Sequence, residues 1–153
     1  MTSSSLCVDA SFMVKLVLPE VDSERAEALW SEWLTMGTAI HAPALMPFEA
    51  ASAIRKHVQR GLITAERGEM AIEAFAGLSQ EISLRPAQSL HPGAWALAER
   101  YNRPNLYDAY YVALAESLDC PLWTADDHLL RVMPGHASRI LSLRASILPP
   151  AET

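Results

Sequence analysis

The sequence lacks most features that mark membrane, secreted or zinc-binding proteins. No stretch approaches ~18 uninterrupted apolar residues, so no segment is expected to span a membrane. The start, MTSSSLCVDA, has no basic segment followed by a long apolar one, so it is not a secretion signal. The two cysteines, Cys7 and Cys120, have no metal-ligand spacing, and we interpret both as reduced thiols. These absences predict a cytoplasmic protein.

Histidine and lysine are also sparse. The five histidines form no HxH or HExxH pattern, which argues against zinc. They are His41, His57, His91, His128 and His136. Only two lysines, Lys15 and Lys56, are available to neutralise nearby acids.

The composition is that of a globular protein. Half of the 153 residues are hydrophobic and 20% are charged, which excludes a disordered chain. This length suits one compact domain that buries about 70% of its unfolded surface. We expect that domain over residues 1–148 and a frayed tail over residues 149–153. The net charge of −6 gives an unpromising field for a phosphate-rich partner, but it suits a basic protein partner or bound cations.

Short apolar segments alternate with helical patterns along the chain. Strands are predicted at residues 5–9, 39–43, 81–86, 121–124 and 139–143. Helices are predicted at residues 11–18, 22–36, 44–60, 64–78, 89–102, 106–118 and 126–132. This alternation predicts a single α/β domain with a mostly parallel sheet covered by helices on both faces.

The helix at residues 22–36 has the clearest end signals. Asp22 or Ser23 is expected to cap it, and Gly37 to end it. Its expected apolar face is Ala28, Leu29, Trp33 and Met36. Leu29, Trp30 and Trp33 suit either the core or an interface.

Four acids are expected at one edge of this sheet. Asp9 ends the first strand, Glu49 is early in the helix after the second, Asp108 begins the helix before the fourth, and Asp126 lies just past that strand. Function in parallel sheets sits at the carboxyl ends of the strands. We therefore expect these four carboxylates to lie close together.

Each acid also has an ordinary structural explanation. Asp9, Asp108 and Asp126 can cap helices, and Glu49 can be a solvated helix residue. The helix behind Asp108 is nearly all apolar, however, so a buried charge there needs a partner. Two carboxylates about 4 Å apart repel by roughly 4 kcal/mol at an effective dielectric near 20. A hard divalent cation, Mg²⁺ or Mn²⁺, bound between these carboxylates would offset the repulsion. We interpret His128, which lies near the acids in sequence, as a surface histidine.

Three segments carry a resemblance to a known family. CVDASFMVKLVLPE, APALMPFEAASAIRK and LYDAYYVALAESLDCPLWTADDHLL resemble, in order, the motifs of the PIN-domain ribonucleases, most closely the VapC toxins of bacterial toxin–antitoxin pairs. The most specific feature is an Asp opening an apolar helix about 18 residues before a T-x-D at a strand end. The match covers essentially the whole chain. One departure is at the third residue after Glu49, which is often Asn in the family and is Ser52 here.

The resemblance implies particular site residues. Asp9, Glu49, Asp108 and Asp126 correspond to the family's catalytic and metal-binding acids. Thr124 and Ser11 correspond to hydroxyl positions that support them. The adjacent Asp127 either replaces Asp126 as the fourth acid or adds to it, and the sequence leaves this choice open.

The resemblance also implies an activity and partners. The expected protein is a toxin that hydrolyses RNA phosphodiester bonds with one or two Mg²⁺ or Mn²⁺ ions. It is expected to form a homodimer and to bind a cognate VapB-like antitoxin. The basic stretch Arg55, Lys56, His57 and Arg60 suits flanking phosphates or a plain solvated helix face equally well.

Three other functions fit part of this pattern. A catalytically inert PIN-like module that binds only metal or a partner stays open. A phosphatase with an aspartate nucleophile usually has D-x-D after the first strand, where this chain has Asp9-Ala10-Ser11. A phospho-accepting receiver domain would need adjacent acids at that place and a lysine after a late strand, and the sequence has neither.

Overall fold

The computed structural model describes residues 4–144 and contains a five-stranded sheet with strand order β3-β2-β1-β4-β5. All four neighbouring pairs are parallel. The strands are β1 Ser5–Val8, β2 Ala39–Pro43, β3 Ile82–Arg85, β4 Leu122–Thr124 and β5 Ile140–Ser142. The five predicted strands are therefore confirmed, each within a residue or two of its expected ends.

Helices connect successive strands, as the alternating pattern predicts. They are α1 Ala10–Val17, α2 Ser23–Met36, α3 Met46–Gln59, α4 Ala65–Leu78, α5 His91–Arg100, α6 Tyr107–Ser117 and α7 His128–Val132. Short 3-10 turns lie at Ser79–Glu81, Ala87–Ser89 and Pro134–His136. The predicted tail, residues 149–153, lies outside the described residues. Within residues 4–144, no helix has the length and apolar character needed to cross a membrane.

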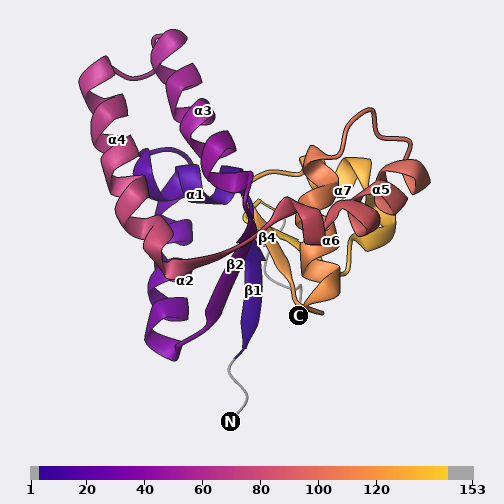
Figure 1. Cartoon of the computed structure of the whole chain (residues 1–153). Helices are drawn as coiled ribbons and strands as arrows, with labels where there is room; N and C mark the ends of the chain where they lie inside the picture. Colours follow the sequence, from indigo (N-terminus) through magenta and orange to yellow (C-terminus); the bar gives the residue numbers. More distant parts are fainter. Residues whose placement is uncertain (1–3, 145–153) are drawn as a thin grey trace, which may run out of the picture.

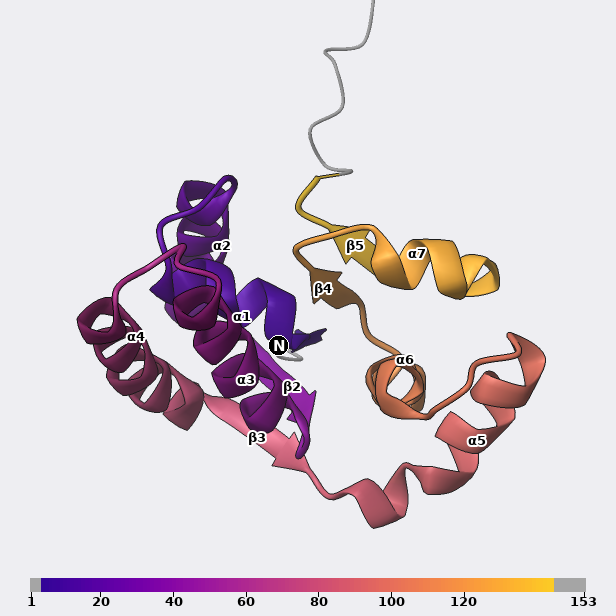
Figure 2. The same ribbon diagram turned by 90° about the horizontal axis from the view of Figure 1, so that it is seen from above.

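The helices form two groups on opposite faces of the sheet. The chain moves from β1 to β2 to β3 in one direction, then returns to β4 and β5 on the other side of β1. Because parallel crossovers are right-handed, these two directions place their helices on opposite faces. Figures 1 and 2 show α1 to α4 on one side of the sheet and α5 to α7 on the other. The predicted α/β architecture is thus confirmed.

Helix α6 is the most buried helix of the fold. All residues from Ala109 to Ala115 are at most 9% exposed, so the helix has no solvated side along that stretch. It packs against β1, β2 and β4 on one side and against α5 on another. An all-apolar helix of this kind is typical of a protein interior. The acid in its first turn, Asp108, is therefore attached to a rigid element.

The predicted apolar face of α2 is partly wrong. Ala28 and Met36 are exposed, while Ala26, Trp30 and Trp33 are buried. These three share one stripe at i, i+4 and i+7, which is the face that the helical period selects once α1 lies beside it. Trp33 packs against Phe12 at 5.2 Å and Trp123 at 5.8 Å between ring centroids, so the tryptophans belong to the core.

The predicted C-terminal end of α2 is observed, whereas the predicted N-terminal capping bond is not. Gly37 ends the helix with φ of 69°, a left-handed conformation that glycine adopts without strain. Asp22 occupies the N-cap position, but its side chain makes no capping hydrogen bond. The Ser23 hydroxyl instead donates to the Leu18 carbonyl at 2.8 Å. It fixes the turn before the helix.

The strand order reverses between β1 and β4. The Cys7 N–H donates to the Pro121 carbonyl at 2.9 Å, and the Asp9 N–H donates to the Trp123 carbonyl at 3.1 Å. The connections that leave β1 and β4 go to opposite faces, which opens a crevice beyond their carboxyl ends. Ligands of open α/β sheets bind at such a reversal. Asp9 leaves β1 at this place, next to the buried Thr124 at the end of β4.

Candidate active site

The Asp9 carboxylate is buried and accepts three hydrogen bonds. Its Oδ1 accepts from the Phe12 N–H at 2.9 Å, as an N-cap of α1, and from the Ser11 hydroxyl at 2.7 Å. Its Oδ2 accepts from the Thr124 hydroxyl at 2.5 Å. The Ala125 N–H donates to the Ser11 oxygen at 3.0 Å, which ties this network to the end of β4. The predicted supporting hydroxyls do contact Asp9, and the capping explanation holds as well.

Burial controls the acidity of Asp9. Loss of water raises the pKa of this carboxyl from its ordinary value of 3.8 to about 6. The three hydrogen bonds oppose this rise, and the nearby charge of Asp126 adds to it. The ionised carboxylate, although still the main form at neutral pH, is thus less stable than a carboxylate in water, and a bound cation would remove part of that cost.

Glu49 is paired with a tyrosine from the buried helix. Glu49 lies in the first turn of α3, half-buried, and its Oε1 accepts from the Tyr111 hydroxyl at 2.5 Å. Burial raises the pKa of Glu49; the hydrogen bond from Tyr111 opposes this rise, and the charge of Asp108 adds to it. Burial and the charges of Glu49 and Asp9 raise the pKa of Tyr111, so its hydroxyl stays a donor.

Asp108 has two cationic or potentially cationic neighbours. Its Oδ2 lies 3.0 Å from the His128 Nε2 and 3.6 Å from the Arg103 Nη2. These are the partners that a carboxylate on a buried helix requires. The interpretation of His128 as a plain surface histidine is wrong in this respect. Its side chain is 45% exposed, yet it contacts Asp108 because α7 starts directly beyond the end of β4.

The two adjacent acids after β4 point to different partners. Asp126 accepts from the His128 N–H at 2.9 Å, and its charge acts on Asp9. Asp127 accepts from the Ser142 hydroxyl at 3.1 Å, at the end of β5. The structure therefore associates Asp126 with the crevice and Asp127 with the outer strand.

The four predicted acids lie near one another in two pairs. The charge of Asp126 raises the pKa of Asp9, and the charge of Asp108 raises the pKa of Glu49. The charges of Asp9 and Glu49 both raise the pKa of Tyr111. Within residues 4–144, no three His, Cys, Asp or Glu side chains are arranged as a ready metal site. A single four-carboxylate cluster therefore stays a prediction. The donor chemistry nevertheless fits a hard cation, because every acid offers carboxylate oxygens and Asp9 is costly to ionise without one.

Three members of the site carried no clear signal in the sequence. Tyr111 lies three residues after Asp108, so the helical period puts both on neighbouring positions of α6. Arg103 precedes α6 in a turn, and His128 follows the last acids. The spacing along α6 indicates only Tyr111 from sequence. Arg103 and His128 contact Asp108 because of the tertiary fold.

Cationic side chains lie beside the acids. A pocket of about 220 Å³ is lined by Lys15, His57 and Arg144 together with Ser11 and Asp126. Lys15 and His57 both pair with Glu20, at 3.3 and 3.5 Å. Glu20 lines the same pocket, so basic and acidic side chains lie together next to the end of β4.

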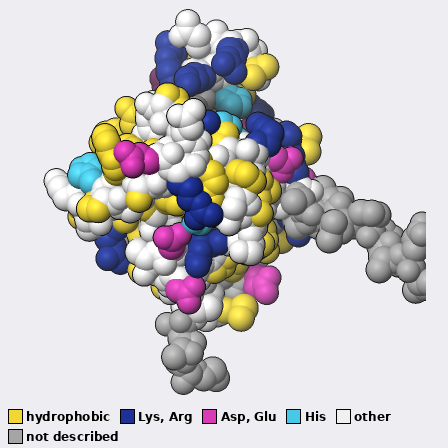
Figure 3. Space-filling view, turned by 90° about the vertical axis from the view of Figure 1, so that its right-hand side faces the viewer, with side chains coloured by type: hydrophobic (Ala, Val, Ile, Leu, Met, Phe, Trp, Pro, Cys, Tyr) yellow, Lys and Arg dark blue, Asp and Glu magenta, His cyan; other side chains and the backbone are white. Residues whose placement is uncertain are grey.

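The basic stretch on α3 extends this region outward. Arg55, Lys56 and Arg60 are exposed, whereas His57 is half-buried and contacts the Ala53 carbonyl at 2.8 Å. Figure 3 shows Lys and Arg side chains gathered near the top of the view, over the far end of the α3–α4 pair. A chain with a net charge of −6 therefore still has a positive region, at the end of α3 opposite to Glu49.

The comparison with known families identifies the domain. A family model described as the PIN domain matches residues 6–133. The chain belongs to the PIN-domain family. The matched span includes all four predicted acids and every strand except β5.

Curated relatives of this PIN domain are named as VapC ribonucleases. Ribonuclease VapC3 of Pyrobaculum aerophilum is 32% identical over 129 residues, which are 84% of this chain and 95% of that protein. Ribonuclease VapC3 of Mycobacterium tuberculosis is 34% identical over 127 residues, which are 83% of this chain and 86% of that protein. The predicted resemblance to VapC ribonucleases is confirmed.

Solved structures show the same fold at lower sequence identity. A crystal structure from Pyrobaculum aerophilum superposes with a TM-score of 0.65 at 21% identity and covers 95% of both chains. A toxin–antitoxin complex from Klebsiella pneumoniae superposes with a TM-score of 0.56 at 18% identity, over 90% of this chain and 97% of that one.

Proposed function

We propose that this PIN domain is a Mg²⁺- or Mn²⁺-dependent endoribonuclease and acts as the toxin of a toxin–antitoxin pair. The observation that carries the proposal is the buried Asp9 carboxylate at the strand-order reversal, with a pKa raised to about 6 and Asp126 beside it. Two neighbouring carboxylates, one of them buried, form a suitable site for a divalent cation. The names of the VapC relatives point to RNA as substrate.

The acids have distinct tasks in this proposal. Asp9, Asp108 and Asp126 would hold one or two ions, with Glu49 bound directly or through water. A bound divalent ion supplies an acidified water and offsets charge on the phosphodiester oxygens. The Thr124 and Ser11 hydroxyls orient Asp9, and Tyr111 orients Glu49. The protein thus holds its carboxylates in place before substrate arrives.

Cationic and aromatic side chains suit the rest of an RNA strand. The pocket lined by Lys15, His57 and Arg144 would hold a phosphate next to the reacting one. Phe48 and Tyr107, 76% and 58% exposed, directly precede Glu49 and Asp108 in sequence. Exposed rings can stack unpaired bases, so an RNA with single-stranded segments is the expected substrate.

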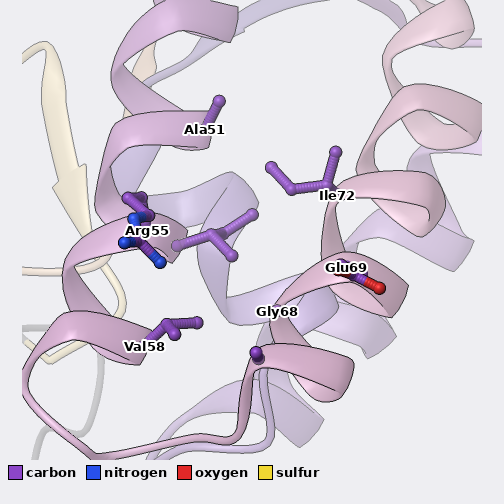
Figure 4. Close-up of a pocket in the computed structure, with 8 residues that line it drawn as sticks. Ala51, Arg55, Val58, Gly68, Glu69 and Ile72 are labelled. Carbon is purple, nitrogen blue, oxygen red and sulfur yellow. The ribbon is translucent and has the colours of Figure 1, made fainter.

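The antitoxin is proposed to dock in an apolar groove between α3 and α4. Figure 4 shows Ala51 and Val58 on α3 facing Ile72 on α4 across this groove, with Arg55 and Glu69 among its lining. A groove of this kind suits the apolar face of a helix. A peptide that runs along α3 in this groove would extend from near Glu49, at the start of the helix, to the basic stretch near its end.

A substitution in the groove tests this docking site. Ile72, on α4, is 41% exposed, and Ile72→Glu would place a charge against an apolar peptide. Antitoxin affinity should fall at least tenfold, which corresponds to about 1.4 kcal/mol. Val21→Glu is the matched control, because Val21 is 76% exposed and lies outside the groove. Equal affinities of the two variants would contradict the placement.

A homodimer is the further expectation of the VapC resemblance. Trp95 on α5 is 60% exposed, and apolar surface of this kind often lies in protein interfaces. Light scattering of the purified chain and of Trp95→Ser would test it. A monomeric wild-type chain would contradict the homodimer.

An RNA cleavage assay tests the activity. The purified chain, freed of antitoxin, is incubated with structured RNAs in Mg²⁺, Mn²⁺ or EDTA, beside Asp108→Asn. Asp119→Asn is the control, because its side chain is 93% exposed and bonded to Arg139, away from the acids. We expect cleavage that needs the metal, disappears in Asp108→Asn and persists in Asp119→Asn. Absence of both cleavage and metal binding in the wild-type chain would favour the inert module.

A further inference from the structure

The only two cysteines of the chain touch each other. Cys7 and Cys120 are 113 positions apart in sequence, yet their Sγ atoms lie 3.6 Å apart. Cys7 is in the middle of β1, and Cys120 directly precedes Pro121 and β4. The parallel pairing of β1 with β4 brings them together, since the Cys7 N–H donates to the Pro121 carbonyl. The structure records both as free thiols, as the sequence predicts.

The two thiols differ in their access to solvent. Cys7 is 0% exposed within the sheet. Cys120 is 5% exposed and lines a pocket of about 280 Å³ together with Asp119, Pro121, Ser138 and Arg139. This pocket lies at the start of β4, whereas the acids lie past its end, so it is separate from the candidate active site. A small reagent in the pocket meets Cys120 first, with Cys7 directly behind it.

An arginine holds the backbone around Cys120. The Arg139 Nη1 donates to the Cys120 carbonyl at 3.0 Å and to the Ala115 carbonyl at 3.3 Å, while its Nη2 pairs with Asp119 at 3.1 Å. The hydrogen bond with Cys7 and the charge of Arg139 lower the pKa of the Cys120 thiol, while burial and the charge of Asp119 oppose the change. A thiol beside a cation and open to a pocket has the features of a reactive cysteine.

We propose that Cys7 and Cys120 form a redox site in which a hydroperoxide converts the two thiols into a disulfide. The Cys120 sulfur attacks the terminal peroxide oxygen, the O–O bond breaks, and an alcohol, or water from hydrogen peroxide, leaves with the thiol proton. Cys120 is then a sulfenic acid. The Cys7 sulfur attacks the Cys120 sulfur, the S–OH bond breaks, and hydroxide leaves as water with the Cys7 proton. Two thiols are oxidised and one peroxide is reduced.

The disulfide would join the two strands that flank the strand-order reversal. Backbone hydrogen bonds already hold β1 and β4 in register at Cys7 and at Asp9, so the sulfur atoms approach without a change in strand pairing. The cross-link closes a loop of more than 100 residues, and long loops gain most in the chain-entropy account. Oxidation therefore stabilises the domain. This inference does not depend on the proposed nuclease activity.

The test compares the reduced chain with the chain treated with hydrogen peroxide. Denaturing mass spectrometry should show the loss of two hydrogen atoms, a peptide joining Cys7 to Cys120, and no thiol left to titrate. The oxidised chain should melt about 5–10 °C above the reduced chain, and dithiothreitol should reverse both changes. Two thiols still titratable after treatment, or sulfinic acids without a cross-link, would overturn the proposal.

Two matched variants test the order of attack. Cys7→Ala keeps the pocket thiol and should accumulate a sulfenic acid at Cys120, which a dimedone probe traps. Cys120→Ala keeps only the buried thiol and should stay unmodified under the same treatment. Equal labelling of the two variants would overturn the assignment of Cys120 as the attacking thiol. The wild-type measurement decides the disulfide itself even if a variant fails to fold.

Discussion

Replacing Asp9 by Asn should stabilise the metal-free protein while removing its activity. Asp9 is 8% exposed, and burial raises its pKa from 3.8 to about 6. Each unit of pKa corresponds to about 1.4 kcal/mol, so the charged carboxylate costs roughly 3 kcal/mol at neutral pH. Asn keeps a similar shape and polar character without the charge. Its one amide oxygen still accepts from the Phe12 N–H, and its NH2 group faces the Thr124 hydroxyl in place of the acceptor Oδ2.

The effect should depend on pH in a defined direction. The folded pKa exceeds the unfolded one, so between pH 3.8 and about 6 the folded state binds more protons than the unfolded state. The contribution of Asp9 to stability is therefore present below pH 3.8 and is lost as the pH rises through about 6. Relative to Asp9→Asn, the wild-type chain should be less stable by about 1 kcal/mol at pH 4.5 and by about 3 kcal/mol at pH 7.5.

Urea unfolding in EDTA measures this difference directly. Other carboxylates titrate in both chains, so their effects cancel in the comparison of wild type with Asp9→Asn. Saturating Mg²⁺ should then stabilise the wild-type chain at pH 7.5 and have little effect on the variant. The reasoning is refuted if the difference is the same at both pH values, or if the variant is the less stable chain at pH 7.5 without metal.

Other variants probe the partners of the remaining acids. Tyr111→Phe removes the donor to Glu49 and should lower the free energy of unfolding by about 1–3 kcal/mol; an unchanged urea midpoint would contradict this. In the RNA assay, Asp126→Asn should lose cleavage and Asp127→Asn should keep most of it, so equal losses would refute the assignment. His128→Ala frees the acid at the start of α6 and should tighten Mg²⁺ binding about two- to fivefold by calorimetry, and weaker binding would argue against it.

The order of elements could be predicted from local patterns. Helix and strand periods and the glycine at position 37 are local signals, and the elements follow them closely. The face that α2 buries could not be predicted in the same way. Ala26 and Trp30 became core residues in place of Ala28 and Met36, because the position of α1 selects the buried stripe.

The candidate site was likewise predictable only in part from the sequence. Asp9 and Asp126 were predicted at strand ends because a parallel sheet brings its carboxyl ends to one edge. The sequence left Asp126 and Asp127 as alternatives. Only the position of β5 distinguishes them, since Ser142 at its end bonds Asp127.

The sequence by itself determined the α/β class and the strand positions, because these depend on local patterns along each helix and strand, and it proposed the candidate acids. Tertiary structure alone decided the partners of those acids. The Tyr111–Glu49 and Thr124–Asp9 hydrogen bonds join positions 62 and 115 residues apart, and the Cys7–Cys120 contact joins positions 113 residues apart. Such contacts depend on strand order and register, which no local pattern contains.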